Sequence, residues 1–345
     1  SKALRACYQV GAERFGWSGR NPQVGSMRED TWLVGYGMAG AGAVYHWYQA
    51  PCRVRVSIGR NGTAQVRSAA TDIGTGTYTV ATQLSAQLLG LDIAQVHVEL
   101  GDSDLPPAPQ SGGSGLAMSL GGAIHDAARN LLRAFLEVVA DDDRSPLQAR
   151  RPDDITVTDG RIHLLEDLSV GETYIDILAR HQLDELTAVG QMNPTADGAA
   201  MAPAGAFAAQ FAEVRIDPEL GLLRVARIVS TVDAGRVLNE KTARSQIIGA
   251  TVMGIGMALL EQTAIDVPSG RIANATFADY LIPVNADVSD LDVVFVGQPD
   301  AFSPIGIKGI GEVGIVGVPA AIANAVYHAT GRRIRSLPIT IDQLL

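Results

Sequence analysis

The chain has 345 residues, of which 47% are hydrophobic and 19% charged, and its formal net charge is -10 at pH 7. This length exceeds the ~100–200 residues of an average domain, so we expect two lobes with a substantial core. Nucleic acid is not expected as a partner, because phosphates demand a basic surface and no basic stripe occurs. No membrane-spanning segment is expected either, because glycines interrupt the longest apolar run, 247–260, which falls short of ~18 residues.

Cysteine and histidine spacing argues against several kinds of site. Cys7 and Cys52 lie too far apart for a CxxC metal site, and two cysteines are too few for a disulfide framework. Any iron–sulfur cluster is therefore expected elsewhere. Ser114 has no obvious His–Asp partner, which disfavours a hydrolase. No HxxxH spacing occurs, so zinc is not expected, and we assign packing or surface roles to four histidines: His46, His97, His125 and His328.

The first half of the chain predicts a hairpin, a helix, a strand and a second helix. Residues 52–67 alternate around Asn61-Gly62, a strong hairpin signal. A glycine loop, 71–77, precedes a helix with apolar residues at a spacing near 3.6, and 96–100 reads as a strand. A Pro/Gly/Ser loop, 104–115, leads into a second helix whose apolar face is Leu120, Ile124, Ala128, Leu131, Phe135 and Val138.

The same order recurs from residue 212. Strands at 214–216 and 223–228, a loop at 233–235 and a helix over about 241–261 are followed by a strand at 292–296, a glycine loop at 304–312 and a helix from Pro319 to Gly331. We therefore expect an α+β fold with two similar mixed α/β lobes, 1–204 and 205–345. Simple duplication of a stable unit would give the same repeat. The connection, 141–204, is expected to be solvated, with two short strands around Gly160.

The glycine loops are candidate ligand sites. Gly74-x-Gly76 resembles half of a dinucleotide fingerprint, but the third glycine is missing and the preceding strands read as a hairpin instead of a βαβ crossover. Free N–H groups at a helix N-terminus favour anionic ligands, and four such loops suggest one extended anion. For Gly112–Gly115, a flexible linker is the alternative interpretation.

Glu312 is the most unusual acidic residue of the sequence. It follows Lys308-Gly-Ile-Gly and is flanked by Ile310, Val313 and Ile315, so we expect its carboxylate to be desolvated and more basic than usual. A structural explanation is open as well: Glu312 would favour a helix N-terminus or pair with Lys308.

Four segments together resemble a known family. Residues 308–314 followed by 319–326 resemble the C-terminal signature of the large subunits of the molybdenum hydroxylases, the xanthine dehydrogenase/aldehyde oxidoreductase family. Residues 232–239 and 245–256 resemble its second glycine-helix segment. Residues 72–77 and 109–115 are similar to the remaining cofactor loops of bacterial aldehyde oxidoreductases, so the resemblance covers nearly the whole chain.

The resemblance implies a cofactor and its site residues. The cofactor is molybdopterin, in bacteria usually the cytosine dinucleotide, and its dithiolene holds the molybdenum without protein ligands. Both lobes would bind it, and Glu312 would be the catalytic base in the second. Many relatives have Gln where this chain has Thr75, so that side chain's hydrogen bond to the pterin is in question. The implied cofactor-binding residues are Gly74, Thr75, Gly76, Thr77, Gly112, Gly113, Ser114, Gly115, Gln246, Lys308, Gly309 and Gly311.

The family also implies a reaction and partners. We expect aldehydes to be oxidised to carboxylic acids with oxygen from water, the electrons passing to 2Fe-2S and FAD subunits; hydroxylation of N-heterocycles such as xanthine or nicotinate is the runner-up. The beginning of the chain resembles an internal stretch of a longer subunit, so an N-terminal molybdopterin lobe is expected to be missing. The chain is then a split subunit or a truncated form, inactive alone. A non-catalytic half-site scaffold is the contrasting possibility. A cytoplasmic location is expected, or a periplasmic one after export with a partner.

Overall fold

The computed structural model describes residues 2–44, 52–192, 205–288 and 290–345. The chain forms two compact units, which we number as follows: unit 1 comprises Ser1–Val44, Ala204–Asp300 and Lys308–Leu345, and unit 2 comprises Tyr45–Pro203 and Ala301–Ile307. This division differs from the expected boundary at residue 204, because the N-terminal segment belongs with the second half of the chain.

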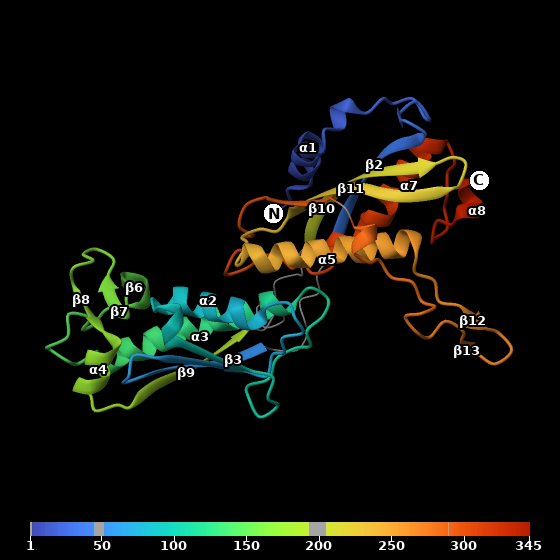
Figure 1. Ribbon diagram of the computed structural model, residues 1–345. Coiled ribbons are helices and arrows are strands. Elements are labelled where there is room, and N and C mark those ends of the chain that lie inside the picture. The colour runs from blue at the N-terminus through green and yellow to red at the C-terminus, as the bar shows by residue number, and fades with distance from the viewer. Residues whose placement is uncertain (1, 45–51, 193–204, 289) are drawn as a thin grey trace. The chain divides into compact units, whose positions relative to one another are not determined.

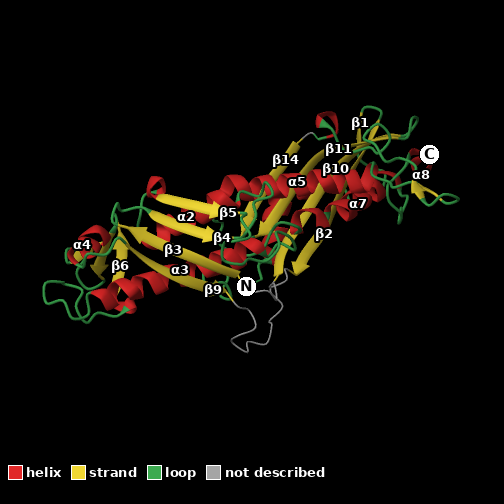
Figure 2. Ribbon diagram, turned by 90° about the horizontal axis from the view of Figure 1, so that it is seen from below, coloured by secondary structure: helices red, strands yellow, loops and turns green. Residues whose placement is uncertain are grey.

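Unit 2 is built on a four-stranded sheet with the order β5-β4-β3-β9. β3 pairs antiparallel with β4 and β9, and β4 pairs parallel with β5. Two helices cover one face (Figures 1 and 2). The expected hairpin, strand and helices of this half are thereby confirmed, with the bounds β3 (Cys52–Gly59), β4 (Ala64–Ser68), α2 (Thr77–Leu89), β5 (Val96–Leu100) and α3 (Leu116–Val138).

One expectation about unit 2 was wrong. The hairpin was expected to take the place of a βαβ crossover, yet β4, α2 and β5 form one, because β4 and β5 pair in parallel from Ala64↔Val96 to Ser68↔Leu100. A strand can belong to both arrangements at once: β4 uses one edge for the hairpin partner and the other for the crossover partner. The Gly74-x-Gly76 loop therefore does lie between a strand and a crossover helix.

The connection after α3 contains more structure than expected. The two short strands around Gly160 are confirmed as β6 (Ile155–Thr158) and β7 (Arg161–Leu164), and β8 (Gly171–Thr173) completes their sheet. A short helix, α4 (Tyr174–Arg180), leads to β9 (Glu185–Met192), which pairs along the whole of β3. The connection thus supplies the fourth strand of the main sheet instead of being only solvated; its residues 193–204 lie outside the described part.

Unit 1 repeats this topology with the strand order β14-β11-β10-β2, extended by β1 beyond β2. β10 pairs antiparallel with β11 and β2, and β11 pairs parallel with β14. The fourth strand precedes the hairpin here, whereas in unit 2 it follows α3, and its long ladder with β10 explains why the N-terminal segment belongs to unit 1. The strands are β1 (Arg28–Glu29), β2 (Trp32–Val44), β10 (Gly205–Asp217), β11 (Leu222–Asp233) and β14 (Asp290–Val296).

Helices cover both faces of the unit 1 sheet (Figure 1). On one face, α7 packs against β2 and β10 through a cluster that includes Ala212 and Val214; on the other, α1 packs against β10 and β11 through Phe211 and Val229. The remaining elements include a short exposed hairpin, β12 (Ile265–Asp266) and β13 (Arg271–Ile272). The helices are α1 (Leu4–Phe15), α5 (Glu240–Leu259), α6 (Val313–Val316), α7 (Val318–Thr330) and α8 (Ile341–Leu344).

Glycines let one helix approach the fourth strand closely in each unit. A Cβ on Gly190 of β9 would lie 2.0 Å from the backbone nitrogen of Ala127 in α3, and a Cβ on Gly37 of β2 would lie 2.2 Å from the backbone oxygen of Ala321 in α7. Residues 313–330 have the length and apolar composition of a membrane span, but 56% of this stretch is buried inside the protein. That burial is typical of a core helix.

Both cysteines are buried and unpaired. Burial raises the pKa of Cys52 to about 12, and burial together with the nearby Asp233 carboxylate raises that of Cys7 to about 12. Both thiols therefore stay protonated at neutral pH and are poor nucleophiles. Among the expected packing histidines, His328 is buried between the backbone of Tyr36 and Asn21. His46 lies outside the described residues.

Candidate functional site

The candidate residues are distributed over both units. The loops Gly74–Thr77 and Gly112–Gly115 belong to unit 2, whereas Gln246 and the segment Lys308–Glu312 belong to unit 1. Each group is therefore a separate part of the expected site. Their convergence on one cofactor stays a prediction.

The first glycine loop is organised by an acidic side chain that sequence reasoning did not single out. Asp72 accepts hydrogen bonds from the backbone nitrogens of Gly74 (2.9 Å), Gly76 (3.2 Å) and Tyr78 (3.2 Å). Partial burial alone would raise the pKa of Asp72, but these backbone donors outweigh it and hold the pKa below its usual value. The N–H groups of this loop were expected to be available to an external anion. This expectation was wrong for these three, because the Asp72 carboxylate accepts their hydrogen bonds.

What the same loop offers a ligand is open space and hydroxyl groups. Gly74 has φ +99° and no atom within 4 Å of a built Cβ, which leaves room for close approach. The hydroxyl groups of Thr75 and Thr77 lie 3.1 Å apart, so one donates to the other. Thr75 therefore provides a hydroxyl group at the position where the sequence resemblance implies a glutamine side chain.

The second glycine loop is a tight turn at the start of a long helix. Gly113 (φ +54°) and Ser114 (φ +56°) are successive left-handed residues, and Gly115 N donates to Gly112 O at 3.2 Å. The left-handed conformation is uncommon for a residue with a side chain and recurs at ligand sites. This geometry favours the ligand-loop interpretation over a flexible linker, because the turn is hydrogen-bonded and feeds directly into α3.

In unit 1, Gln246 is half-buried on the first half of α5. The helix begins at Asn239, whose side chain accepts a hydrogen bond from Thr242 N at 2.9 Å, a standard N-cap. This cap fixes the first turns of α5 and with them the direction in which Gln246 projects.

Glu312 is exposed within unit 1, and this differs from the expected desolvation. The apolar neighbour Val313 is fully buried, so it fills the core below the loop instead of surrounding the carboxylate. Glu312 stands at the N-terminus of the one-turn helix α6 and makes no capping hydrogen bond with its side chain. The carboxylate is thus presented outward by a loop whose other side chains anchor it.

Lys308 has the opposite environment. Its side chain is completely buried, and its Nζ lies 2.7 Å from Asp233 Oδ2 and 3.8 Å from Asp300 Oδ2. Lys308 therefore forms ion pairs with Asp233 and Asp300. Sequence reasoning missed Asp233, although an acidic residue at the end of an apolar strand and just before a glycine loop is a usable signal, because a buried charge requires a partner.

Gln210 is a second residue that sequence reasoning missed. It lies in β10 with no exposed surface, and its Nε2 donates to Val313 O at 3.4 Å. An amide inside the apolar run 205–212 is the signal that could have found it, since a buried polar residue is more informative than an exposed apolar one.

The available donors fit the cofactor that the sequence implies. A pterin with phosphate groups needs hydrogen-bond donors in an open loop. Since Asp72 already binds nitrogens of the first loop, the 74–77 loop offers the hydroxyl groups of Thr75 and Thr77 and the open space at Gly74. The 112–115 loop offers the hydroxyl group of Ser114 in a left-handed turn. Within the described ranges, no group of three or more His, Cys, Asp or Glu side chains is arranged to hold a metal ion.

Comparisons with known proteins bear directly on this site. Residues 10–289 match the molybdopterin cofactor-binding domain family. The chain is 38% identical over its full 345 residues to the aldehyde oxidoreductase molybdenum-binding subunit PaoC of Escherichia coli strain K12, of which it spans 45%. It is also 30% identical, over 361 aligned positions and all of this chain, to the xanthine dehydrogenase molybdenum-binding subunit of Escherichia coli O157:H7, of which it spans 46%.

The chain thus spans about half the length of the curated relatives it matches. Among solved structures, quinoline 2-oxidoreductase from Pseudomonas putida 86 superposes on 99% of this chain and 45% of that one with a TM-score of 0.87. Sequence identity to it is 22%, so this likeness concerns the fold, and it confirms the expected α+β architecture. The chain belongs to the molybdopterin cofactor-binding domain family, of the aldehyde oxidoreductase and xanthine dehydrogenase type.

Proposed function

We propose that this chain is the molybdopterin-binding module of a molybdenum hydroxylase that oxidises aldehydes to carboxylic acids with oxygen from water, and that Glu312 is its catalytic base. The observation that carries the proposal is the outward carboxylate of Glu312, on a loop whose neighbours Lys308 and Val313 are buried, in a chain of this family. A general base must reach the proton that it accepts, and such a loop presents it.

The cofactor, when bound, supplies the two-electron oxidation chemistry, and the protein supplies placement. When the cofactor is bound, the 74–77 and 112–115 loops would hydrogen-bond the pterin and its cytosine dinucleotide, and Gln246 would contact the pterin. Glu312 accepts a proton while the water-derived oxygen adds to the substrate carbon. Because Glu312 is exposed within unit 1, we propose that the cofactor and the rest of the enzyme exclude water from it.

The share of the relatives that this chain spans, 45% for the aldehyde oxidoreductase subunit, supports a proposal about partners. We propose that a further molybdopterin lobe completes the cofactor site, and that 2Fe-2S and FAD subunits receive the electrons. The chain alone is then a half-site that does not retain molybdenum. Metal analysis of the chain purified alone and with its partner polypeptides tests this; stoichiometric molybdenum in the isolated chain would contradict it.

Hydroxylation of an N-heterocycle is the second candidate reaction. The similarity of this chain to a xanthine dehydrogenase subunit favours it. Sequence identity to that subunit is 30%, which is lower than the 38% identity to the aldehyde oxidoreductase subunit. Reduction of the assembled enzyme by an aromatic aldehyde, compared with xanthine and nicotinate, decides between the two substrate classes.

The role of Glu312 is tested by Glu312→Gln in the assembled enzyme. The amide has nearly the same shape but cannot accept the proton, so we expect single-turnover reduction by substrate to slow ~10²–10⁴-fold, with molybdenum content and melting temperature unchanged. Glu219→Gln, an exposed glutamate in the β10–β11 turn, is the matched control. Near-normal reduction by the Glu312→Gln enzyme would reject Glu312 as the base.

A further inference from the structure

The loop that carries Glu312 is bonded at both ends to the central sheet of unit 1. At its start, Lys308 N donates to Ala234 O at 3.1 Å, and Lys308 Nζ contacts Asp233 Oδ2 at 2.7 Å. At its end, Val313 O accepts from Gln210 Nε2 at 3.4 Å. The segment between these bonds contains Glu312 and two glycines, which by themselves place little restraint on the backbone.

Asp233 is itself held firmly. It ends β11, has no exposed surface and accepts a second hydrogen bond, from Ala3 N at 2.8 Å. The chain packs so tightly here that a Cβ on Gly297 would lie 2.4 Å from Asp233 Oδ1. The position of the Asp233 carboxylate is therefore fixed by its surroundings. The ion pair with Asp233 in turn fixes the position of the Lys308 side chain.

Gln210 is enclosed in the same way at the other end. A Cβ on Gly317, the residue between α6 and α7, would lie 2.1 Å from Gln210 Oε1. The Gln210 side chain thus projects from β10 and packs tightly against the α6–α7 junction. The position of its amide determines where the carbonyl group of Val313 can lie. Since Val313 directly follows Glu312, this bond restrains the backbone of Glu312 itself.

We propose that Asp233 and Gln210 are positioning residues that hold the 308–313 loop at its two ends and thereby fix the backbone of Glu312. Lys308 then acts as the side chain through which Asp233 holds the loop, in place of the direct cofactor contact expected from the sequence. The inference rests on the proposed role of Glu312 as the base. Placement matters because a shift of about 1 Å in a reacting group can cost ~10²-fold in rate.

The test uses two conservative variants in the assembled enzyme. Gln210→Met has a similar length but no hydrogen bond to Val313. Asp233→Asn keeps an oxygen that can accept from Ala3 but removes the negative charge that attracts Lys308. Lys308 stays paired with Asp300, so no isolated charge is buried. Thr231→Val is the matched control: it removes buried hydrogen bonds from the same strand, to the backbone of Cys7 and Ala209, without touching the loop.

We expect each variant to lower kcat about tenfold and the combined variant about 100-fold, with KM and molybdenum content little changed. Independently of activity, amide hydrogen exchange in peptides covering 308–316 should become faster in the variants and stay unchanged in Thr231→Val. A purely structural role would lower the melting temperature without this split between kcat and KM.

Three results would overturn the inference. Unchanged exchange in the loop would show that neither residue holds it. Faster exchange with normal kcat, in an enzyme that Glu312→Gln inactivates, would show that the restraint is not needed for catalysis. Full activity of Glu312→Gln would remove the proposed base and with it the catalytic meaning of the anchors, while the exchange data would still show whether they hold the loop.

Discussion

The two units share a strand order but solve the burial of their sheets differently. In unit 2, exposed Arg53 and Arg55 alternate with buried Val54 and Val56 along β3, so helices cover only one face. In unit 1, β10 is buried almost throughout, because α1 covers the face that has no helix in unit 2. The same topology therefore serves as an open two-layer unit and as a closed three-layer one.

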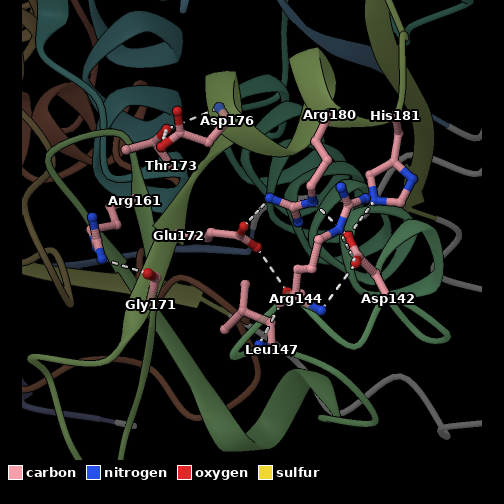
Figure 3. Close-up of polar contacts among 11 residues, drawn as sticks. Asp142, Arg144, Leu147, Arg161, Gly171, Glu172, Thr173, Asp176, Arg180 and His181 are labelled. Carbon is pink, nitrogen blue, oxygen red and sulfur yellow. Dashed lines mark hydrogen bonds and ion pairs between the residues drawn. The ribbon is translucent and has the colours of Figure 1, made fainter.

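Buried charges also occupy different places in the two units. In unit 1, Asp233 and Lys308 lie beneath the candidate catalytic loop. In unit 2, Arg180 lies between Asp142 and Glu172 (Figure 3). The distance from Arg180 Nε to Asp142 Oδ2 is 2.5 Å. This cluster follows the C-terminal end of α3, roughly 33 Å along that helix from the 112–115 loop at its start.

The cluster of unit 2 is therefore interpreted as a structural clip. Ser145 donates to Glu172 at 2.7 Å, and Arg144 and His181 both contact Asp142 at 3.1 Å, so the turn after α3 is tied to β8 and α4. Similar chemistry, a buried ion pair, therefore lies near the candidate site in unit 1 and far from the glycine loop in unit 2.

The substitution with the largest expected effect on stability removes the central cation of this clip. Arg180→Met leaves two carboxylates in a buried environment without their shared cation, and breaking a buried pair typically costs about 3–5 kcal/mol. Since 17% of the Arg180 side chain is exposed, we expect about 3 kcal/mol from the lower end of that range. Urea unfolding of the chain measures it, with molybdenum content of the assembled enzyme as a second readout.

Arg151→Met is the matched control for this clip. Its side chain is 81% exposed and its partner Asp154 lies 3.3 Å away, so the loss should stay within ~1 kcal/mol. Equal effects of Arg151→Met and Arg180→Met would mean that burial does not distinguish the clip from a surface pair.

The second expected effect concerns the glycines that the two units have in common. Gly37→Ala and Gly190→Ala would each place a Cβ within 2.2 Å of helix backbone, so the helix must shift, and such overpacking costs about 1–3 kcal/mol. Gly19→Ala, with nothing within 4 Å, is the control. Thermal unfolding of each variant is the measurement. If only one of the two buried replacements destabilises the chain, the units are not equivalent in how the helix meets the fourth strand.

The difference between the sheets also explains which strands could be predicted. The hairpin β3–β4 alternates polar and apolar residues around Asn61-Gly62, so its two strands are predictable from the sequence alone. β2 reads Trp-Leu-Val-Gly-Tyr-Gly-Met-Ala-Gly-Ala-Gly-Ala-Val and shows no alternation of polar and apolar residues. Helices meet this strand at Gly37, which faces α7, and at Gly40, which faces Tyr8 of α1. Small residues in such a strand allow close packing of neighbouring backbone. A search for polar/apolar periodicity therefore does not detect the strand.

The candidate site was predictable in the same uneven way. The loops and Glu312 were found because glycine patterns and the family resemblance are local in sequence. Asp72 lies beside its loop and was overlooked as a ligand of the loop's own nitrogens. Asp233 and Gln210 act on residues about 75 and 103 positions away, and such pairings depend on the sheet that brings the segments together.

A smaller effect is the pH dependence of the clip. Burial would raise the pKa of Asp142, but hydrogen bonds from Arg180 and Arg144 outweigh it and hold the pKa below its ordinary value of ~3.9. A carboxylate with a lowered pKa in the folded state stabilises the protein above its unfolded pKa, and this contribution is lost as the pH falls through the folded pKa. The stability difference between wild type and Arg180→Met should therefore be largest near neutral pH and shrink as the pH falls toward and below about 4, because acid neutralises the carboxylates that the variant leaves without their shared cation. A difference that grows on acidification would contradict this sign.

The smallest effect distinguishes the crossover helices of the two units. α2 of unit 2 contains no glycine, whereas α5 of unit 1 contains Gly249, Gly254 and Gly256. A Cβ on Gly249 would meet no atom within 4 Å, so Gly249→Ala should stabilise the chain by about 0.5–1 kcal/mol, because alanine loses less backbone entropy in a helix.

Gly254→Ala is the internal contrast. Its Cβ would lie 2.6 Å from the Cβ of Val318, the first residue of α7, so the same substitution five residues later should destabilise the chain. Denaturant midpoints of the two variants give the sign directly. Opposite signs would assign the Gly254 position to packing between α5 and α7 and leave Gly249 without a structural role inside unit 1. Destabilisation by Gly249→Ala would instead show that α5 is strained or packed at a place where the structure has open space.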